Sequence, residues 1–379
     1  MRPLRFLHVF GTFDHGGAEA RTLELMRGFG GRAAHVVLVA DQSALGARSA
    51  IAPGVQASFP VDPSRMVSGH PLPPRLLRLA RLMRGYDLVL TYGWGAMDVV
   101  LAHRLLSRPM RLPKLVHHED GIDPPRRGAG RWLRRAYRRF ALRGADRIVV
   151  PSQSLLAIAL AEWRLPARRL ACIPNGVKMD GDDGSAATGA ATSRDRPGQI
   201  QIVAVAGLRP EKNLPRLVRT AAQAGDDIRL AILGEGPERA AIVAEARMRG
   251  FEDRLDLCGF VPNVGDYLNA ADIFALSSDT EQCPLSLIEA MAAGLPVVAP
   301  RVGDIESMVA EANRPFIVPH ADEARFAAAI RTLADDPAMR REIGRANAEH
   351  ARRHHSSAPM IDTYFQLYAG LSGSRPAAS

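Results

Sequence analysis

The chain has 379 residues, of which 47% are hydrophobic and 23% charged. This length predicts about two domains, and the composition is globular, which excludes a disordered or fibrous protein. The three cysteines are scattered and odd in number, which excludes a disulfide framework and indicates a reducing compartment. No run of 18 apolar residues occurs, so we expect no transmembrane span.

The net charge of +9 is unevenly distributed along the chain. Residues 1–178 hold 28 Lys and Arg against 12 Asp and Glu, a net of +16, whereas residues 179–379 hold 21 against 28, a net of −7. In Arg75–Arg84 and Arg126–Arg143, apolar residues alternate with arginine at helical spacing. Such basic helices bind anionic membranes, or they bury the apolar stripe and leave the arginines in solvent. No nucleic-acid motif accompanies the charge, so we expect no nucleic-acid partner.

The first half of the chain alternates short apolar runs with helical patterns, which is typical of a parallel sheet covered by helices. The expected strands are Arg5–Phe10, His35–Ala40, Leu88–Tyr92, Leu115–His118, Ile148–Pro151 and Leu170–Ile173. The expected helices include Ala18–Phe29, Met97–Leu106 and Gln153–Ala161.

A second α/β series follows a segment rich in Gly, Asp, Ala, Ser and Thr at Met179–Gly198, which we interpret as a linker. Its expected strands are Ile200–Ala206, Arg229–Leu233, Leu255–Cys258, Ile273–Leu276 and Pro296–Ala299. Its expected helices are Asn213–Ala224, Pro237–Arg249 and Pro284–Ala293, and the tail from Asp322 is helical.

Candidate site residues follow two strands of the first half. Gly16 and Gly17 precede a helix that Glu19 begins, and glycines at such a turn let backbone N–H groups approach a phosphate or a sugar. His117 and His118 follow the strand Lys114–Val116, where a side chain points into a cleft. We choose His118, although the strand register decides which of the two faces inwards.

The second half carries a candidate phosphate loop in Gly207–Leu214, GLRPEKNL, between a strand and a helix. Lys212 would add a positive charge to the backbone donors at the helix start, and Arg209 would add a fork of donors. A further turn, Gly234-Glu235-Gly236-Pro237, lacks the complete G-x-G-x-x-G pattern, so a dinucleotide fold is not supported.

The stretch Thr280–Ala299, TEQCPLSLIEAMAAGLPVVA, places Glu281 and Glu289 eight residues apart around a helix start. Helix N-termini bind anions, and carboxylates accept hydrogen bonds from hydroxyl groups. The combination suits a sugar that carries a diphosphate. Metal ligation is not expected, because no second His or Cys pair has ligand spacing and the Asp180-Gly-Asp182 pattern lies in the linker.

These motifs resemble those of retaining GT-B glycosyltransferases of family 4, the group 1 glycosyl transferases. The resemblance implies an α/β fold of GT-B type, two doubly wound Rossmann-like domains facing across a cleft. Residues 1–178 would form the acceptor-side domain, with a C-terminal helix at about 357–379 packing back on it. Residues 179–198 would be the linker, and 199–356 the nucleotide-sugar domain.

The resemblance also implies roles for individual residues. His118, Glu281 and Lys212 would be catalytic, and Gly16 and Glu19 would lie on the acceptor side. The donor-binding residues would be Gly17, Arg209, Lys212, Glu235, Cys283, Leu285, Ser286 and Glu289. This chain departs from the family pattern at Gly207, where arginine is common, at Gln282, where glycine is common, and at Cys283, where an aromatic residue is common.

We therefore expect a metal-independent hexosyltransferase without a cofactor. It would transfer sugar from a nucleotide-diphosphate donor to a saccharide or polyprenyl-linked acceptor in bacterial exopolysaccharide or lipopolysaccharide assembly. The expected location is the cytoplasm, at the inner face of the membrane if the basic helices bind lipid. The alternatives are a GT-B nucleotide-sugar epimerase and a non-catalytic membrane-surface scaffold.

Overall fold

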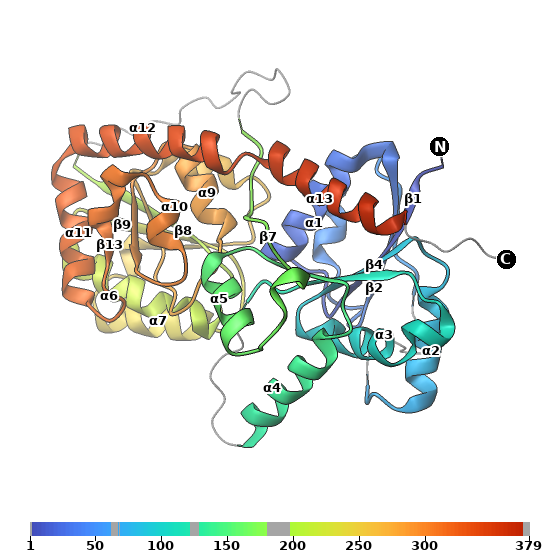
Figure 1. Ribbon diagram of the computed structural model, residues 1–379. Helices are drawn as coiled ribbons and strands as arrows, with labels where there is room; N and C mark the ends of the chain where they lie inside the picture. The colour runs from blue at the N-terminus through green and yellow to red at the C-terminus, as the bar shows by residue number, and fades with distance from the viewer. Residues whose placement is uncertain (1, 62–66, 68, 122–128, 180–197, 374–379) are drawn as a thin grey trace. The chain divides into compact units, whose positions relative to one another are not determined.

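The computed structural model describes residues 2–61, 67, 69–121, 129–179 and 198–373 (Figure 1). The chain divides into two compact units: unit 1 comprises Met1–Pro174 and Ala358–Ser379, and unit 2 comprises Asn175–Ser357. The boundary thus falls four residues before the expected one at 178. Residues 180–197 of the expected linker lie outside the described residues.

Unit 1 is built on a seven-stranded parallel sheet in the order β3-β2-β1-β4-β5-β6-β7. Its strands are β1 (Leu4–Phe10), β2 (Ala33–Val39), β3 (Ala57–Ser58), β4 (Leu88–Tyr92), β5 (Lys114–His118), β6 (Arg147–Val150) and β7 (Leu170–Cys172). Because all pairs are parallel, the carboxyl ends of the strands lie along one edge of the sheet.

Helices cover both faces of this sheet, as the alternation along β1 shows. Leu7 and Val9 pack in one core cluster with the helices α2 (Pro73–Met83), α3 (Met97–Met110), α4 (Ala129–Leu142) and α5 (Gln153–Ala161). Phe6 and Phe10 pack in another cluster with α1 (Gly17–Phe29) and α13 (Ser357–Ser372). In Figure 1, α13 runs beside α1, and its Tyr364 and Tyr368 are fully buried in this cluster.

Unit 2 repeats the plan with a six-stranded parallel sheet in the order β10-β9-β8-β11-β12-β13. Its strands are β8 (Ile200–Val205), β9 (Ile228–Leu233), β10 (Leu255–Gly259), β11 (Ile273–Ala275), β12 (Val297–Pro300) and β13 (Ile317–Val318). One core cluster joins the sheet to α6 (Leu214–Ala224), α7 (Arg239–Met248) and α11 (Glu323–Asp335). The other joins it to α8 (Val264–Ala270), α9 (Leu285–Ala292) and α10 (Ile305–Met308). The helix α12 (Pro337–His354) contributes to both clusters.

The α/β class with two doubly wound sheets is confirmed. The sequence analysis missed the edge strands β3 and β13, because two residues carry no periodic signal. It also missed the short helices α8 and α10, whose seven and four residues give too few turns for an amphipathic pattern.

Candidate active site

The loops that follow β8, β9 and β10 in unit 2 are held together by backbone hydrogen bonds. The Leu208 N–H donates to the Glu235 carbonyl at 2.9 Å, and the Gly234 N–H donates to the Gly259 carbonyl at 2.8 Å. Gly234 has a φ of 143°, and a Cβ there would lie 2.0 Å from the Ala206 carbonyl oxygen. The predicted glycine turn is therefore required for this close approach of two backbones.

Lys212 and Glu281, predicted from separate motifs, meet at the carboxyl ends of β8 and β11. The Lys212 Nζ donates to Glu281 Oε1 at 2.6 Å, and the Ser278 hydroxyl donates to the same oxygen at 2.6 Å. Glu281 is 8% exposed and Lys212 is 23% exposed. The ammonium group is thus held by a buried carboxylate and remains partly open to a ligand, as a diphosphate-binding cation must be.

Two further contacts hold these loops in register. The Ser277 hydroxyl donates to the Lys212 carbonyl at 2.9 Å, and the Asp279 N–H donates to the Glu211 carbonyl at 2.8 Å. Because these bonds tie the loop after β11 to the loop after β8, they fix where the Lys212 side chain begins.

The sequence analysis missed two residues that support this pair. Arg216 is buried, donates to the Ser277 carbonyl and lies 3.1 Å from Asp279 Oδ1. Gly303, at a φ of 53°, packs so closely that a Cβ would lie 2.0 Å from the Glu281 carbonyl oxygen. Arg216 lies among apolar residues of α6, a weak sign of a buried structural role, and the sequence around Gly303 gave no sign.

The predicted helix start is α9, preceded by Pro284. Pro284 makes no side-chain cap to this N-terminus, and Leu285 and Ser286 at its first positions are partly exposed. Their N–H groups have no carbonyl partner within the helix, because a helix leaves its first turn of donors unused. Cys283 is buried, and its carbonyl accepts from the Asn175 amide at 2.7 Å.

Glu289 lies on α9 and is partly buried. Burial raises the pKa of its carboxyl above the usual value. Within the part of the chain that the structure describes, its side chain has no hydrogen-bond or ion-pair partner. A desolvated acceptor of this kind is suited to a hydroxyl-bearing ligand.

The other two predicted donor residues of unit 2 are exposed. Arg209 precedes a short 3₁₀ turn that ends at Lys212, and Glu235 lies in the loop between β9 and α7. The Glu235 side chain lies over Gly259, where a Cβ would come within 2.6 Å of its Oε1. The packing of unit 2 does not explain why these two exposed side chains are charged. Their donor roles stay predictions.

Unit 1 has its own cavity of about 220 Å³, at the carboxyl ends of β1, β4 and β5. Its wall is built from glycine backbone and from carboxylates, including Gly11, Gly93, Gly95, Glu19, Glu119 and Asp120. Gly11 and Gly95 are packed against each other, since a Cβ on Gly95 would lie 2.5 Å from the Gly11 Cα. A cavity rich in carboxylate oxygens suits a ligand that donates many hydrogen bonds.

Asp120 is held in this wall by Arg21, which the sequence analysis did not single out. The Arg21 side chain is 2% exposed and donates through both terminal nitrogens to Asp120, with the Nη2–Oδ2 bond at 2.8 Å. Burial alone would raise the pKa of the Asp120 carboxyl, but the guanidinium overrides this effect and holds the pKa below its usual value. Asp120 therefore presents a fixed negative charge at the cavity.

His118 lies on the opposite side of β5 from His117, and both rings are buried. The His118 Nδ1 donates to the Thr91 carbonyl at 3.2 Å, so the neutral Nε2 accepts from the Tyr368 hydroxyl at 2.7 Å. Burial, with the nearby Arg21, lowers the pKa of His118 to about 3, and the ring stays neutral.

His117 is also engaged, with its Nδ1 2.9 Å from the Thr91 hydroxyl and its Nε2 3.6 Å from Glu119 Oε2. Neither histidine lines the cavity of unit 1; the next residues, Glu119 and Asp120, do. Glu119 and Asp120 therefore lie at the cavity where an open histidine was expected, because His117 and His118 are the last two residues of β5 and both rings are buried. The catalytic role of His118 stays a prediction.

Gly16, predicted for the acceptor side, and Gly17, predicted to bind the donor, lie at the start of α1. Gly16 is extended and has no side chain cap to offer, and Gly17 has open space where a Cβ would be. Glu19, in the first turn of α1, lines the cavity of unit 1.

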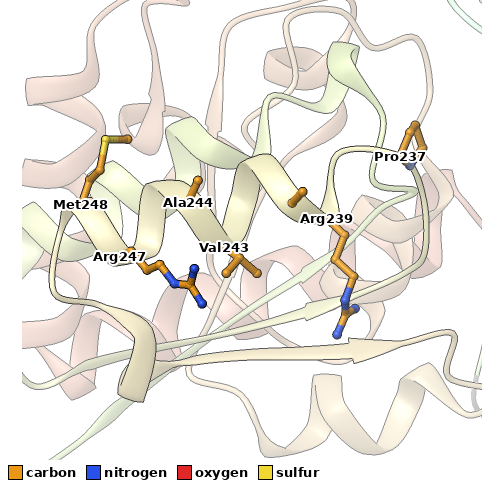
Figure 2. Close-up of a pocket in the computed structure, with 7 residues that line it drawn as sticks. Pro237, Arg239, Val243, Ala244, Arg247 and Met248 are labelled. Atoms are coloured by element: carbon orange, nitrogen blue, oxygen red, sulfur yellow. The ribbon is translucent and has the colours of Figure 1, made fainter.

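A larger hollow, of about 780 Å³, lies on the outer side of α7 in unit 2 (Figure 2). Its lining consists of α7 side chains with Pro237, and none of the predicted site residues contributes to it. We therefore do not assign it to the active site. Among the described residues, no three His, Cys, Asp or Glu side chains converge as metal ligands.

Comparison with solved structures identifies the class of fold. The chain superposes with a TM-score of 0.80 on HepE (Alr3699) of Anabaena in complex with UDP-glucose, at 18% identity over 97% of this chain and 100% of that one. It superposes with a TM-score of 0.75 on sucrose-phosphate synthase of Thermosynechococcus elongatus, at 20% identity over 98% and 100%. These matches show the two-domain GT-B fold.

Family models match both halves of the sequence. Residues 15–180 match Glycosyltransferase Family 4, and residues 191–350 match Glycosyl transferases group 1. With the GT-B fold, these two matches show that the chain belongs to the group 1 glycosyltransferases.

Curated relatives agree with this family. The chain is 26% identical to a D-inositol 3-phosphate glycosyltransferase of Kribbella flavida over 90% of this chain and 88% of that protein. It is 30% identical to the lipopolysaccharide core biosynthesis glycosyltransferase LpsD of Rhizobium meliloti, over 37% of this chain and 40% of that protein. The predicted enzyme class, a glycosyltransferase, is confirmed.

Proposed function

We propose that this protein is a retaining glycosyltransferase that moves a sugar from a nucleotide-diphosphate donor to a hydroxyl group of a saccharide or lipid-linked acceptor. The observation that carries the proposal is the Lys212–Glu281 pair of 2.6 Å in the same unit as the start of α9, where Pro284 makes no side-chain cap. A partly open cation and free helix donors suit a diphosphate leaving group, and carboxylates suit the sugar and ribose hydroxyls. Structures of HepE with UDP and with UDP-glucose support a nucleotide-sugar donor.

In this mechanism the bond from the sugar carbon to the diphosphate breaks as the acceptor hydroxyl attacks the same face of the sugar. Lys212 stabilises the negative charge that develops on the diphosphate, and the N–H groups of Leu285 and Ser286 add their dipoles. Glu281 orients Lys212 and accepts from sugar hydroxyls, while Glu289 accepts from the ribose. The acceptor hydroxyl passes its proton to the departing phosphate, so no metal ion, cofactor or covalent nucleophile is required.

We place the acceptor hydroxyls at the cavity of unit 1, where Glu19, Glu119 and Asp120 supply acceptors. His118 is then a positioning residue, because its ring anchors the end of β5 to α13 through Tyr368 directly before these carboxylates. The named curated relatives are glycosyltransferases, so the epimerase alternative is not retained.

The acceptor class that we favour is a lipid-linked saccharide of exopolysaccharide or lipopolysaccharide assembly. The match to LpsD supports this choice, as does the strongly basic surface of unit 1. Such an acceptor would place the protein at the cytoplasmic face of a membrane. None of the described helices is long and apolar enough to cross one.

The test is a thermal-shift screen against UDP, GDP, ADP and TDP and their common sugars, with Lys212→Ala alongside. A nucleotide at 100 times its Kd should stabilise the wild-type protein by about 2.7 kcal/mol, and the variant should lose most of the shift. NMR of the transferred product should then show the anomeric configuration of the donor. A shift that the variant keeps in full would contradict the donor site, and an inverted product would contradict the retaining mechanism.

A further inference from the structure

The helices α2, α3 and α4 form one layer on unit 1, and their outer surface has an unusual composition. α2 packs against α3, and α3 packs against α4. Their inner sides join the same core cluster against the sheet. The opposite sides face solvent, and we call them together the basic face.

The basic face exposes large apolar side chains. Eleven such side chains are exposed among the described residues, and six of them belong to these three helices or to the residue directly before α2. They are Leu72, Leu77, Leu105, Trp132, Leu133 and Phe140. Trp132 is 71% exposed and Leu133 60%, although they are neighbours on α4 and could have been buried together. A concentration of this kind marks an interaction surface.

The charge of the same helices is almost entirely positive. Their sequences contain ten arginines and one acidic residue, Asp98. Asp98 is already paired inside the layer, because Arg75 donates to it at 2.6 Å and Tyr137 donates to it at 2.5 Å. The exposed arginines include Arg78, Arg81, Arg104 and Arg108. No acidic side chain of these helices is left to neutralise them.

The outer side of α7 in unit 2 provides a contrast within the same protein (Figure 2). It also exposes an apolar side chain, Met248, next to Arg247 at one end of α7, with Arg239 at the other end of the helix. There, however, acidic neighbours compensate the charge: Arg247 donates to Glu252 at 3.0 Å, and Glu245 accepts from Arg249 at 3.0 Å. On the basic face one exposed arginine, Arg135, is likewise paired with an acidic neighbour, Glu162. Among the described residues, however, no acidic side chain pairs with Arg78, Arg81, Arg104 or Arg108, so the basic face keeps most of its positive charge.

We propose that the basic face docks on an anionic lipid bilayer. In this proposal the aromatic rings of Trp132 and Phe140 and the leucine side chains insert at the boundary between headgroups and acyl chains. The arginines bind lipid phosphates. Duplex nucleic acid would use the arginines but would leave the aliphatic side chains in water. Single strands would stack on Trp132 but would gain nothing from the leucines of α2 and α3.

The docking helix is connected to the proposed reaction through its inner side. Arg138 on α4 is buried and lies with its Nε 3.5 Å from Glu119 Oε2, and Glu119 lines the cavity of unit 1. A bilayer that holds α4 would therefore also hold one wall of the cavity. This connection rests on the proposed function, whereas membrane docking itself does not.

The experiment measures co-sedimentation of the full chain with vesicles of phosphatidylcholine alone and with 40% phosphatidylglycerol added, from low to high salt. We expect binding only to the anionic vesicles and a steep loss with salt, because surface charges are screened. Arg78→Ser with Arg81→Ser should weaken binding about 30-fold, at the strength of two arginine contacts. Trp132→Ser with Leu133→Ser should weaken it about 10-fold or more.

The matched control is Met248→Ser with Arg239→Ser on α7, which should bind as the wild-type protein does. Near-ultraviolet circular dichroism checks that each variant is folded. Equal binding to neutral vesicles, or full binding by both basic-face variants, would overturn the proposal. So would tighter binding to an oligonucleotide that the Trp132 and Leu133 substitutions leave unchanged. The assay contains neither donor nor acceptor, so its failure is distinct from a failure of the transferase proposal.

Discussion

The two units share one architecture but use their polar residues differently. Unit 2 brings Lys212 and Glu281 together and carries Glu289 on α9, and each keeps some exposure or an unused acceptor. Unit 1 instead buries its polar groups and pairs them, with Arg21 fixed on Asp120 and His118 on Tyr368. Unit 2 thus offers one cation and two carboxylates to a ligand. Unit 1 holds a cavity lined by glycine backbone and carboxylates, and Arg21 fixes one of these carboxylates, Asp120.

The frame of unit 1 also accounts for its expected sensitivity to acid. Beside His118, it buries His8 and His35, with the His8 Nε2 2.9 Å from the His35 Nδ1. Burial lowers the pKa of His35 to about 4 and that of His8 well below its usual value. Protonating any of these three buried rings would place a charge in the core of unit 1 and destabilise the folded state.

Acidification should therefore have the largest effect, and it should fall on unit 1. The histidines of the unfolded chain bind protons below about pH 6.5, whereas burial lowers the pKa of His35 to about 4, that of His118 to about 3 and that of His8 well below its usual value. The buried neutral rings therefore do not destabilise unit 1 above about pH 6.5. Below that pH its free energy of unfolding falls, by up to about 4 kcal/mol per pH unit when all three rings contribute. Among the histidines of unit 2, the pKa values of His350 and His355 are lowered, and these rings are less deeply buried than those of unit 1, so the slope of unit 2 should be smaller.

The measurement is urea unfolding between pH 7.5 and 5, followed by tryptophan fluorescence. All three tryptophans, Trp94, Trp132 and Trp163, belong to unit 1, so this signal reports on that unit alone. Far-ultraviolet circular dichroism follows both units together. His35→Gln should flatten the pH dependence of the fluorescence transition. A transition midpoint that does not move between pH 7.5 and 5 would contradict the buried histidine cluster.

Arg21→Met should have the next largest effect. It leaves the Asp120 carboxylate without the cation that offsets its burial, so unit 1 should lose about 3–5 kcal/mol of stability. Urea unfolding at pH 7.5, followed by tryptophan fluorescence, gives this value. Adding Asp120→Asn should recover much of the loss, because the uncompensated charge is then removed. A loss under about 1 kcal/mol in the single variant would place the pair among weak surface contacts.

Lys212→Ala tests unit 2 and should lower kcat/KM by about 10²–10³-fold, the scale of removing one group that stabilises transition-state charge. Initial rates with the donor found in the thermal-shift screen give the value. Arg209→Ala is the matched control: its side chain lies in the same loop but is exposed, so the loss should be under about 10-fold. Equal losses in both variants would mean that the loop acts through its net charge and not through the Lys212–Glu281 geometry.

Glu289→Gln should have the smallest effect, with opposite signs for binding and stability. The raised pKa of Glu289 means that its ionised form is disfavoured in the folded state, a cost present at pH 7 and relieved as the pH falls towards that pKa. The neutral amide removes this cost, so unit 2 should become slightly more stable. Nucleotide affinity should fall about 10-fold, because a charged acceptor for the ribose is lost. Unchanged affinity in a calorimetric titration would remove Glu289 from the donor site.

Local patterns in the sequence were sufficient to predict the helices that have several turns and the strands that have several alternating residues. They were also sufficient for groups that lie close along the chain, such as Pro284, Leu285 and Glu289 around one helix start. Amphipathic periodicity and turn chemistry act over a few residues, so a single segment displays them completely. The basic composition of α2 and α4 was visible for the same reason.

Only the tertiary structure decided which distant groups meet. Lys212 and Glu281 are 69 residues apart, Arg21 and Asp120 are 99 apart, and His118 and Tyr368 are 250 apart. Parallel sheets bring the ends of remote strands together, and strand order and register are not encoded in any one segment. For this reason His118 was expected to open into a site, whereas the sheet and α13 enclose it and present Glu119 and Asp120 in its place.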